Sequence, residues 1–381
     1  MTLPVRDTVP VLPPASGAWR EGDPVGDRLF LTVDGLPLES GDTLPEVRVA
    51  YETWGRYDGH NAVLVLHALT GDSHVTGDAG DGHPTPGWWS SMVGPGAPID
   101  TDRWFVVAPN VLGGCQGTTG PSSAAPDGRP WGSRFPRTTV RDQVALEARF
   151  ADALGIDAWA VVLGGSMGGM RAVEWAVMFP DRVERLLLLA CGAAASADQI
   201  AWASPQLTAI REDPGWAGGD YHDAERGHGP HLGLGIARRI AHATYRSAEE
   251  LDIRFGRRPQ PGEDPAVGGR YAIESYLDHH AEKLVHRFDA GTYVVLTEAM
   301  NNHDVARGRG SLADALGRIT ARTVVAGSTS DRLYPLSQQE ELAALVPGCE
   351  PVRLIESPYG HDAFLVETRR LEQIFAEVLE R

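Results

Sequence analysis

A serine at position 166 lies in a sequence pattern that is typical of a nucleophile. Residues 163–169 read LGGSMGG, and Gly164, Ser166 and Gly168 form the pattern G-x-S-x-G between an apolar run and a helical one. In such a strand–turn–helix the serine sits on a sharp, strained turn, where glycines avoid collisions across the turn. The following helix N-terminus offers free N–H groups to a developing negative charge. A glycine-rich turn with an incidental serine is the competing interpretation, but the spacing of dinucleotide and P-loop motifs is absent.

A serine hydroxyl needs a base and a group that orients the base. With this kind of turn the acid and the histidine follow the serine in that chain order, at the ends of later strands. Asp331 follows an apolar run at 323–326, and His361 follows another at 352–355. The sequence therefore predicts a triad of Ser166, Asp331 and His361. Taken singly, Asp331 could instead pair with Arg332 or cap a helix, and His361 could simply start one.

The loop after the first apolar run is expected to complete an oxyanion hole. In this arrangement one backbone N–H comes from that loop and another from the residue after the nucleophile. The donors would be Leu69 and Met167. His67 precedes the other triad members in the chain and is predicted to fix the loop rather than to act as a base.

The elements that must hold these residues form an α/β pattern. Residues 47–55 alternate between apolar and polar side chains, which predicts an antiparallel strand. Six short apolar runs predict parallel strands. They are residues 62–66, 104–108, 158–163, 185–190, 323–326 and 352–355. Helical patterns lie between them, at 140–151, 167–178 and 363–379. The pattern predicts an α/β-hydrolase fold, with a mostly parallel sheet covered by helices on both faces.

The region from 195 to 316 breaks this alternation. It contains helical patterns at 233–245 and 271–287 and a Gly/Pro/Asp-rich stretch at 259–269. We interpret it as a helical cap inserted into the fold. The predicted organisation is therefore a first core segment (1–194), the cap (195–316) and a second core segment (317–381).

Composition limits the classes of partner. The formal net charge is −17, which opposes binding to nucleic acids or anionic membranes at long range. Three widely spaced cysteines favour reduced thiols, and the histidines show no metal-ligand spacing, so no metal site is predicted. Residues 1–20 contain no signal-peptide pattern and are expected to form a loose arm, and no apolar run is long enough to span a bilayer. We expect a cytoplasmic protein.

Beyond these residues, the chain resembles the homoserine O-acetyltransferase family from about Leu29 to Leu379. The resemblance is carried by five segments that are more specific than the serine motif: HALTGDSH (67–74), NVLGGCQGTTGP (110–121), GGSMGGM (164–170), GIARRIAHATYR (235–246) and YGHD (359–362). Small differences lie at 218–219 and 259–265, which look like local insertions.

The resemblance implies a reaction and a set of substrate contacts. Acetyl would pass from acetyl-CoA to Ser166 and then to the hydroxyl of L-homoserine, an early step towards methionine, with acetyl-CoA as a substrate and no cofactor. Arg238 would bind the homoserine carboxylate, Asp362 its ammonium group, and Tyr245 would lie nearby. An Arg fork suits a carboxylate, although Arg239 is a rival for that role and Tyr245 could be a packed aromatic. The resemblance also implies a homodimer formed through the cap.

Several alternatives stay open at this stage. The donor could be succinyl-CoA or the acceptor serine, although Thr70 resembles the residue of acetyl-using members. An esterase could use the same triad with water. A non-catalytic interaction protein is disfavoured because all three triad residues are present. The residues that bind CoA cannot be located from the sequence.

Overall fold

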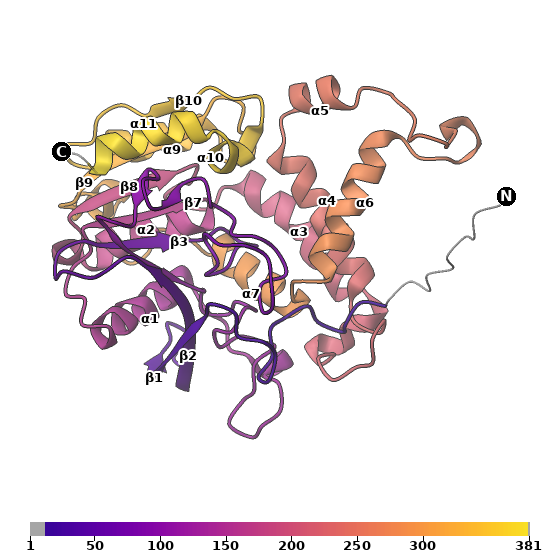
Figure 1. Cartoon of the computed structure of the whole chain (residues 1–381), viewed down its shortest axis with the longest axis horizontal. Helices are drawn as coiled ribbons and strands as arrows, with labels where there is room; N and C mark the ends of the chain where they lie inside the picture. Colours follow the sequence, from indigo (N-terminus) through magenta and orange to yellow (C-terminus); the bar gives the residue numbers. More distant parts are fainter. Residues whose placement is uncertain (1–11, 380–381) are drawn as a thin grey trace.

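The computed structural model describes residues 12–379, which form an α/β core with a helical cap on one side (Figure 1). Eight strands make the main sheet in the order β1-β2-β6-β3-β7-β8-β9-β10. Their bounds are β1 Leu29–Pro37, β2 Thr43–Trp54, β3 Ala62–Leu66, β6 Phe105–Pro109, β7 Val161–Gly165, β8 Arg185–Leu189, β9 Arg322–Ser328 and β10 Arg353–Ile355. β2 runs antiparallel to β1 and β6, whereas the pairs formed among β3, β6 and β7 to β10 are parallel. A separate parallel pair is formed by β4 (Val93–Gly94) and β5 (Ile99–Asp100).

The predicted fold class is confirmed, and the two faces of the sheet are covered by different helices. One face packs against α1 (Val140–Ala153), α2 (Met167–Met178), α8 (Leu312–Leu316) and α9 (Leu336–Leu345). The other packs against α10 (Ala363–Val366) and α11 (Thr368–Leu379). β3 is buried on both sides, and its side chains alternate between the two apolar clusters, as expected for a central strand.

The cap lies between β8 and β9 in the chain. Its helices are α3 (Ala197–Arg211), α4 (His231–Tyr245), α5 (Ala248–Arg254), α6 (Ala272–Val285) and α7 (Ala290–Asn301). Figure 1 shows α4, α5 and α6 to one side of the sheet, with the 259–269 stretch projecting beyond α6. No helix within residues 12–379 combines the length and the apolar content needed to cross a bilayer.

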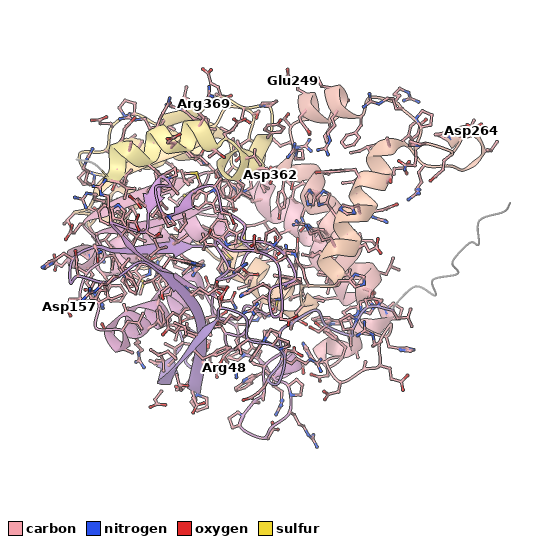
Figure 2. The ribbon with its side chains drawn as sticks, viewed as in Figure 1. Arg48, Asp157, Glu249, Asp264, Asp362 and Arg369 are labelled. Atoms are coloured by element: carbon pink, nitrogen blue, oxygen red, sulfur yellow. The ribbon has the colours of Figure 1, made fainter. Side chains whose placement is uncertain are left out.

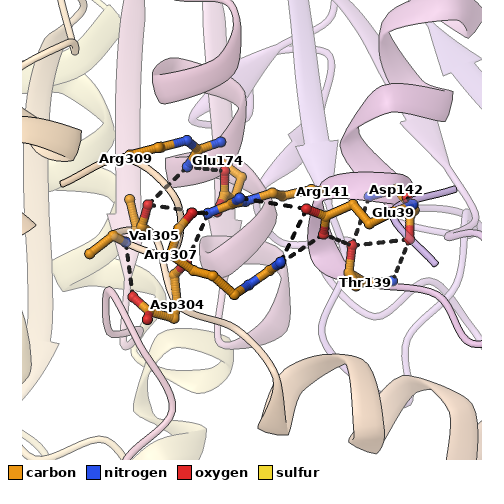
Figure 3. A network of polar contacts seen from close by, with 10 residues as sticks. Glu39, Thr139, Arg141, Asp142, Glu174, Asp304, Val305, Arg307 and Arg309 are labelled. Atoms are coloured by element: carbon orange, nitrogen blue, oxygen red, sulfur yellow. Dashed lines mark hydrogen bonds and ion pairs between the residues drawn. The ribbon is translucent and has the colours of Figure 1, made fainter. Parts of the chain in front are cut away.

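A polar network ties the segment after α7 to the core (Figure 3). Buried Glu174 on α2 lies 3.2 Å from Arg141 and 2.7 Å from Arg309. Arg141 also donates to the carbonyl oxygen of Arg307 at 2.7 Å, and Arg307 pairs with Glu39 at 2.7 Å. Because these contacts join α1, α2 and the chain that leaves the cap, they fix how the cap returns to the sheet.

The prediction of a loose N-terminal arm is wrong for the part that the structure describes. Gly17 donates its N–H to the Phe288 carbonyl at 3.1 Å, and Trp19 donates to that of Cys115 at 2.9 Å. The buried hydroxyl of Ser16 donates to Asp289 at 2.7 Å. These long-range contacts, which a local pattern cannot reveal, attach the segment to the base of the cap. Residues 1–11 of the predicted arm lie outside the described residues.

Candidate active site

Ser166 occupies the strained turn that the sequence predicted, between β7 and α2. Its backbone angles are φ 57° and ψ −122°, a conformation that non-glycine residues rarely adopt. The turn is possible because its neighbours approach closely. A Cβ on Gly168 would lie 2.0 Å from the Leu66 carbonyl oxygen, and one on Gly164 would lie 2.4 Å from the backbone of Gly168. The two glycines therefore let helix α2 begin directly above the end of β3.

The structure brings Ser166, His361 and Asp331 into one line of hydrogen bonds. His361 Nε2 lies 2.9 Å from Ser166 Oγ, and His361 Nδ1 lies 2.7 Å from Asp331 Oδ2. All three residues are buried, with exposed fractions of 4–5%. An ionised carboxylate can only accept, so Nδ1 carries the proton and Nε2 is free to accept from the serine hydroxyl. This is the arrangement that a general base requires.

Asp331 is itself held in one orientation. Its Oδ1 accepts the backbone N–H groups of Leu333 at 2.9 Å and Tyr334 at 2.8 Å, which turns Oδ2 towards His361. The ring of Tyr334 stacks on the imidazole with centroids 4.9 Å apart. Burial lowers the pKa of His361, but the charge and hydrogen bond of Asp331 outweigh this effect, so the pKa lies above the usual value of 6.5. Tyr334 was not singled out from the sequence, although its position three residues after Asp331 is a usable signal.

The loop expected to form the oxyanion hole follows β3 and approaches the start of α2. Within the described residues, the backbone N–H groups of Leu69 and Met167 donate to no other protein group. Buried His67 accepts the Val111 N–H through Nε2 at 3.0 Å and donates from Nδ1 to the Ala68 carbonyl at 2.8 Å. Burial lowers the pKa of His67 to about 3, so the ring is neutral. His67 thus has the contacts of a residue that fixes the loop.

A buried ion pair supports the same loop from below. Arg171, fully buried on α2, donates to the His67 carbonyl at 3.3 Å. Its guanidinium also donates to Glu147 on α1, through Nε at 2.8 Å and through Nη2. The second carboxylate oxygen of Glu147 accepts from the Trp175 indole at 2.7 Å. The sequence analysis missed this pair, because charged residues on a helix are usually solvent-exposed.

The predicted substrate contacts lie where the cap meets the core. Arg238 on α4 reaches Thr70 of the oxyanion loop, with Nη1 3.4 Å from Thr70 Oγ1. Within residues 12–379 no carboxylate lies within 4.0 Å of its guanidinium, and its Nε is buried without a hydrogen-bond partner. Its rival Arg239 pairs instead with Asp278. Tyr245 lies beside Arg238, with 5.7 Å between the guanidinium carbon and the ring centroid, and 5.9 Å from the ring of His361.

Asp362 lies at the boundary between core and cap (Figure 2). Its Oδ2 is 3.3 Å from Nη1 of Arg246, a cap residue that the sequence analysis did not single out. Burial raises the pKa of Asp362, and His361, Arg246 and Arg238 offset this only in part. The Asp362 carboxylate and the Arg238 guanidinium, which has no carboxylate partner among residues 12–379, therefore both lie close to Tyr245, and a zwitterionic ligand needs one group of each charge.

A small cavity adjoins this arrangement. It has a volume of about 50 Å³ and lies between the oxyanion loop, the cap helices and the loop after β9. Its lining is largely apolar and includes Leu69, Met170, Tyr245, Met300 and Tyr334. Ser166 and His361 are not among the lining residues, so the cavity adjoins the reaction centre through Leu69, Tyr245 and Tyr334.

One group of possible metal ligands occurs among the described residues: Asp27, Glu52, His74 and His83. The two imidazoles stack face to face, with centroids 3.7 Å apart and planes within 12°. Their nitrogens are engaged in hydrogen bonds, since His74 Nδ1 contacts Glu52 at 2.9 Å and His83 Nε2 accepts the Asp27 N–H at 2.9 Å. Parallel rings do not direct their lone pairs to one point, so the cluster is not arranged as a tetrahedral site. The absence of a metal from this protein stays a prediction.

Comparisons with known proteins agree with this geometry. Residues 61–368 match a family described as "alpha/beta hydrolase fold". The chain is 66% identical over 377 residues to a protein of Thermobifida fusca named homoserine O-acetyltransferase, covering 98% of this chain and 99% of that one. Its structure resembles that of homoserine O-acetyltransferase from Bacillus anthracis, with a TM-score of 0.83, 27% identity and coverage of 93% and 97%. It also resembles esterase E22, with a TM-score of 0.82, 25% identity and coverage of 92% and 99%.

Proposed function

The chain belongs to the homoserine O-acetyltransferase family of the α/β-hydrolase superfamily, and from this membership we propose that it transfers acetyl from acetyl-CoA to the hydroxyl of L-homoserine. Two observations together carry the proposal. Ser166, His361 and Asp331 form a line of hydrogen bonds, and the nearby Arg238 guanidinium has no carboxylate partner in the part of the chain that the structure describes. A hydrolase needs the first feature alone. A transferase that uses an amino acid needs both.

The first half-reaction acylates the serine. Ser166 Oγ attacks the thioester carbonyl carbon while His361 Nε2 takes the hydroxyl proton. Negative charge develops on the carbonyl oxygen, where the N–H groups of Leu69 and Met167 would stabilise it. The C–S bond then breaks, His361 returns the proton to the departing sulfur, and CoA leaves an acetyl ester on Ser166.

The second half-reaction transfers the acetyl group to the acceptor. The homoserine hydroxyl attacks the ester carbonyl and gives its proton to His361. The bond to Ser166 Oγ breaks, and the serine regains its proton from His361. A ping-pong mechanism follows, because CoA leaves before homoserine reacts.

Acceptor recognition would use the charges of Arg238 and Asp362, which both lie near Tyr245. The guanidinium of Arg238 would bind the carboxylate of homoserine in a charge-assisted pair, and Asp362 would bind its ammonium group through the oxygen that Arg246 leaves free. The burial of Ser166 and His361 limits access of water to the acyl-enzyme, which favours a bound hydroxyl over hydrolysis.

The second candidate function is ester hydrolysis, which the likeness to esterase E22 favours. It would use the same serine, histidine and oxyanion donors, with water as the acceptor. The cavity beside Leu69 has a largely apolar lining, which suits the methyl group of an acetyl donor better than the carboxylate of a succinyl donor. Serine as acceptor has one methylene fewer than homoserine between its ammonium-bearing carbon and its hydroxyl, so the same two charged contacts would hold its hydroxyl farther from His361.

The biological setting is part of the proposal. We place the enzyme in the cytoplasm, in the synthesis of methionine, and as a homodimer paired through the cap. Leu232 on α4 and Ile253 on α5 support the dimer, since they expose 68% and 74% of their surface on the cap and a second cap would cover them.

The test is CoA release from acetyl-CoA with and without L-homoserine, with L-serine and succinyl-CoA as parallel substrates. We expect release that depends on homoserine and on the acetyl donor, and none from a Ser166→Ala variant. Release that ignores homoserine would establish the hydrolase instead. Release that is faster with serine or succinyl-CoA would correct the choice of substrate.

A further inference from the structure

The acid and the base of the triad lie in two loops that leave neighbouring strands. Asp331 follows β9, and His361 follows β10 after the segment 356–360, which we call the histidine loop. The two strands are parallel, and the last pair of their ladder is Ser328 with Ile355. Because the ladder ends before either triad residue is reached, other contacts must set the separation of the two loops.

The hydroxyl of Ser330 bridges these loops. It donates to the Ser357 carbonyl at 2.5 Å and accepts the Gly360 N–H at 3.0 Å. Ser357 lies two residues beyond the end of β10, as Ser330 lies two residues beyond the end of β9. The side chain therefore continues the link where the backbone ladder stops. Ser330 directly precedes Asp331, and Gly360 directly precedes His361, so the bridge acts next to both triad residues.

Hydrogen bonds fix the orientation of this hydroxyl. Ser328 Oγ lies 3.2 Å from Ser330 Oγ, and Ser328 must be the donor, because the Ser330 proton goes to the Ser357 carbonyl. A hydroxyl has one donor site and two acceptor sites, and here Ser357, Gly360 and Ser328 occupy all three. The bridge between the loops therefore has a defined geometry.

The histidine loop is packed against the cap on its other side. Gly360 has φ 63°, and a Cβ at this position would lie 2.7 Å from the Tyr245 carbonyl oxygen and 2.9 Å from the Ser247 nitrogen. The Ser247 hydroxyl also donates to the Pro358 carbonyl. The cap thus blocks movement of the loop in one direction, and Ser330 restrains it from the core.

We propose that Ser330 is a positioning residue for acyl transfer, whose hydroxyl holds His361 at hydrogen-bonding distance from both Asp331 and Ser166. The inference rests on the proposed function, because acyl transfer is the reaction whose rate it would set. Two backbone N–H groups of its own loop orient the Asp331 carboxylate, but they do not determine how far His361 lies from it. The bridge supplies that constraint and acts through His361 rather than on the substrate.

The experiment measures the first turnover of CoA release from acetyl-CoA by a Ser330→Ala variant. The substitution removes both links between the loops and leaves the triad side chains in place. A displaced base should lower the acylation rate by about 10- to 100-fold. The acetyl-CoA concentration that gives half the maximal rate should stay near the wild-type value, because the bridge contacts none of the residues proposed to bind substrate.

The pH dependence of that rate separates positioning from a loss of stability. Burial lowers the pKa of His361, but Asp331 raises it above 6.5, and Asp362 adds to this rise. Tyr334 and Tyr245 also face the ring, and they stay neutral because burial raises their pKa. A longer contact with Asp331 weakens its effect while the burial persists. The midpoint of the rate in the variant should therefore fall by about half a pH unit or more, whereas a loss of stability alone would leave it unchanged.

Three further variants complete the test. Ser330→Thr retains the hydroxyl and should keep the wild-type rate and midpoint. Ser311→Ala removes the hydroxyl that caps α8 through Asp314, away from the triad, so it should lower stability and leave both quantities unchanged. Thermal unfolding checks each variant. If Ser330→Ala does not fold, Ser330→Cys takes its place, because the larger sulfur and its weaker hydrogen bonds lengthen both contacts of the bridge.

The outcomes separate this inference from the proposed function. If the wild type releases no CoA from acetyl-CoA, the proposed function fails, and the variants are then compared on p-nitrophenyl acetate, whose cleavage needs only the triad and the oxyanion donors. On either substrate, a lower rate with a lower midpoint supports the role of Ser330. A wild-type rate, or a lower rate with an unchanged midpoint, overturns the inference.

Discussion

Replacing Asp331 with asparagine should inactivate the enzyme through the histidine tautomer rather than through a loss of structure. In the wild type Oδ1 of Asp331 accepts two backbone N–H groups, those of Leu333 and Tyr334, and Oδ2 faces His361 Nδ1. An asparagine at this position has one oxygen and one NH2 group to place against these two sets of partners. The two backbone N–H groups select its oxygen, so its NH2 group faces the histidine.

The opposite orientation is costly enough to be rare. That orientation would place the NH2 group of the asparagine against two backbone N–H donors. Each of these donors would lose its acceptor, at a free-energy cost of about 1–3 kcal/mol. Even a total free-energy penalty of about 2 kcal/mol would leave only about 3% of the molecules in that orientation. The NH2 group then donates to Nδ1, and the proton of His361 moves to Nε2. A protonated Nε2 cannot accept from Ser166, and the expected loss in kcat is about 10⁴-fold.

The assay is the single-turnover release of CoA from acetyl-CoA, measured across pH. The wild-type rate should rise with pH, because His361 must be neutral to act as a base, and the midpoint should lie above 6.5, because Asp331 raises the pKa of His361. Asp362→Asn is the matched control: it should raise the KM for homoserine and retain acylation. An Asp331→Asn variant that folds normally and acylates within about tenfold of the wild type would refute the tautomer argument.

Three other changes address the substrate contacts and the support of the oxyanion loop. Arg238→Ala should raise the KM for homoserine about 10- to 100-fold and spare acylation by acetyl-CoA; loss of acylation in steady-state and single-turnover assays would assign Arg238 to the donor. Glu147→Gln leaves the buried guanidinium of Arg171 without its carboxylate and should lower the free energy of unfolding by about 3–5 kcal/mol in urea titrations, and a change below about 1 kcal/mol would contradict this. The pKa of His67 is lowered to about 3 in the folded protein, whereas it is about 6.5 in the unfolded chain. Its contribution to the free energy of unfolding is therefore complete above pH 6.5 and is lost as the pH falls. His67→Gln should therefore reduce the acid destabilisation between about pH 7.5 and pH 5 by about 2 kcal/mol, and an unchanged pH dependence would exclude His67 as its source.

The parts of the fold that the sequence predicted well have a strong local signal. The run at 62–66 and the helix at 167–178 match β3 and α2 at both ends, because each is bounded by residues that stop the pattern. Helix α3 was missed because Pro205 lies in its interior, and α7 because it is buried on nearly all sides and shows little helical periodicity. The closing helix was predicted as one, but it is interrupted at Glu367 between α10 and α11.

The site shows the same division between local and tertiary signals. Chain order and strand ends were sufficient to select Ser166, Asp331 and His361, which the structure brings together. Tyr334 and Arg246 escaped notice because their importance comes from contacts across the site, with His361 and Asp362 respectively. Such partners are fixed by packing. In the sequence, Tyr334 is marked only by its position three residues after Asp331, and no pattern marks Arg246.

If Arg238 binds the acceptor as proposed, those tertiary contacts would also link acceptor binding to catalysis. Two cap arginines reach Thr70, since Arg238 contacts its hydroxyl at 3.4 Å and Arg287 donates to its carbonyl at 3.0 Å. Thr70 directly follows Leu69, whose N–H is expected to stabilise the oxyanion. From the other side, Arg171 holds His67 of the same loop. A homoserine carboxylate that draws Arg238 towards itself would thus act on the loop only from the cap side, because the core side stays fixed. Acceptor binding would then shift the N–H donors of the oxyanion hole while the loop stays folded.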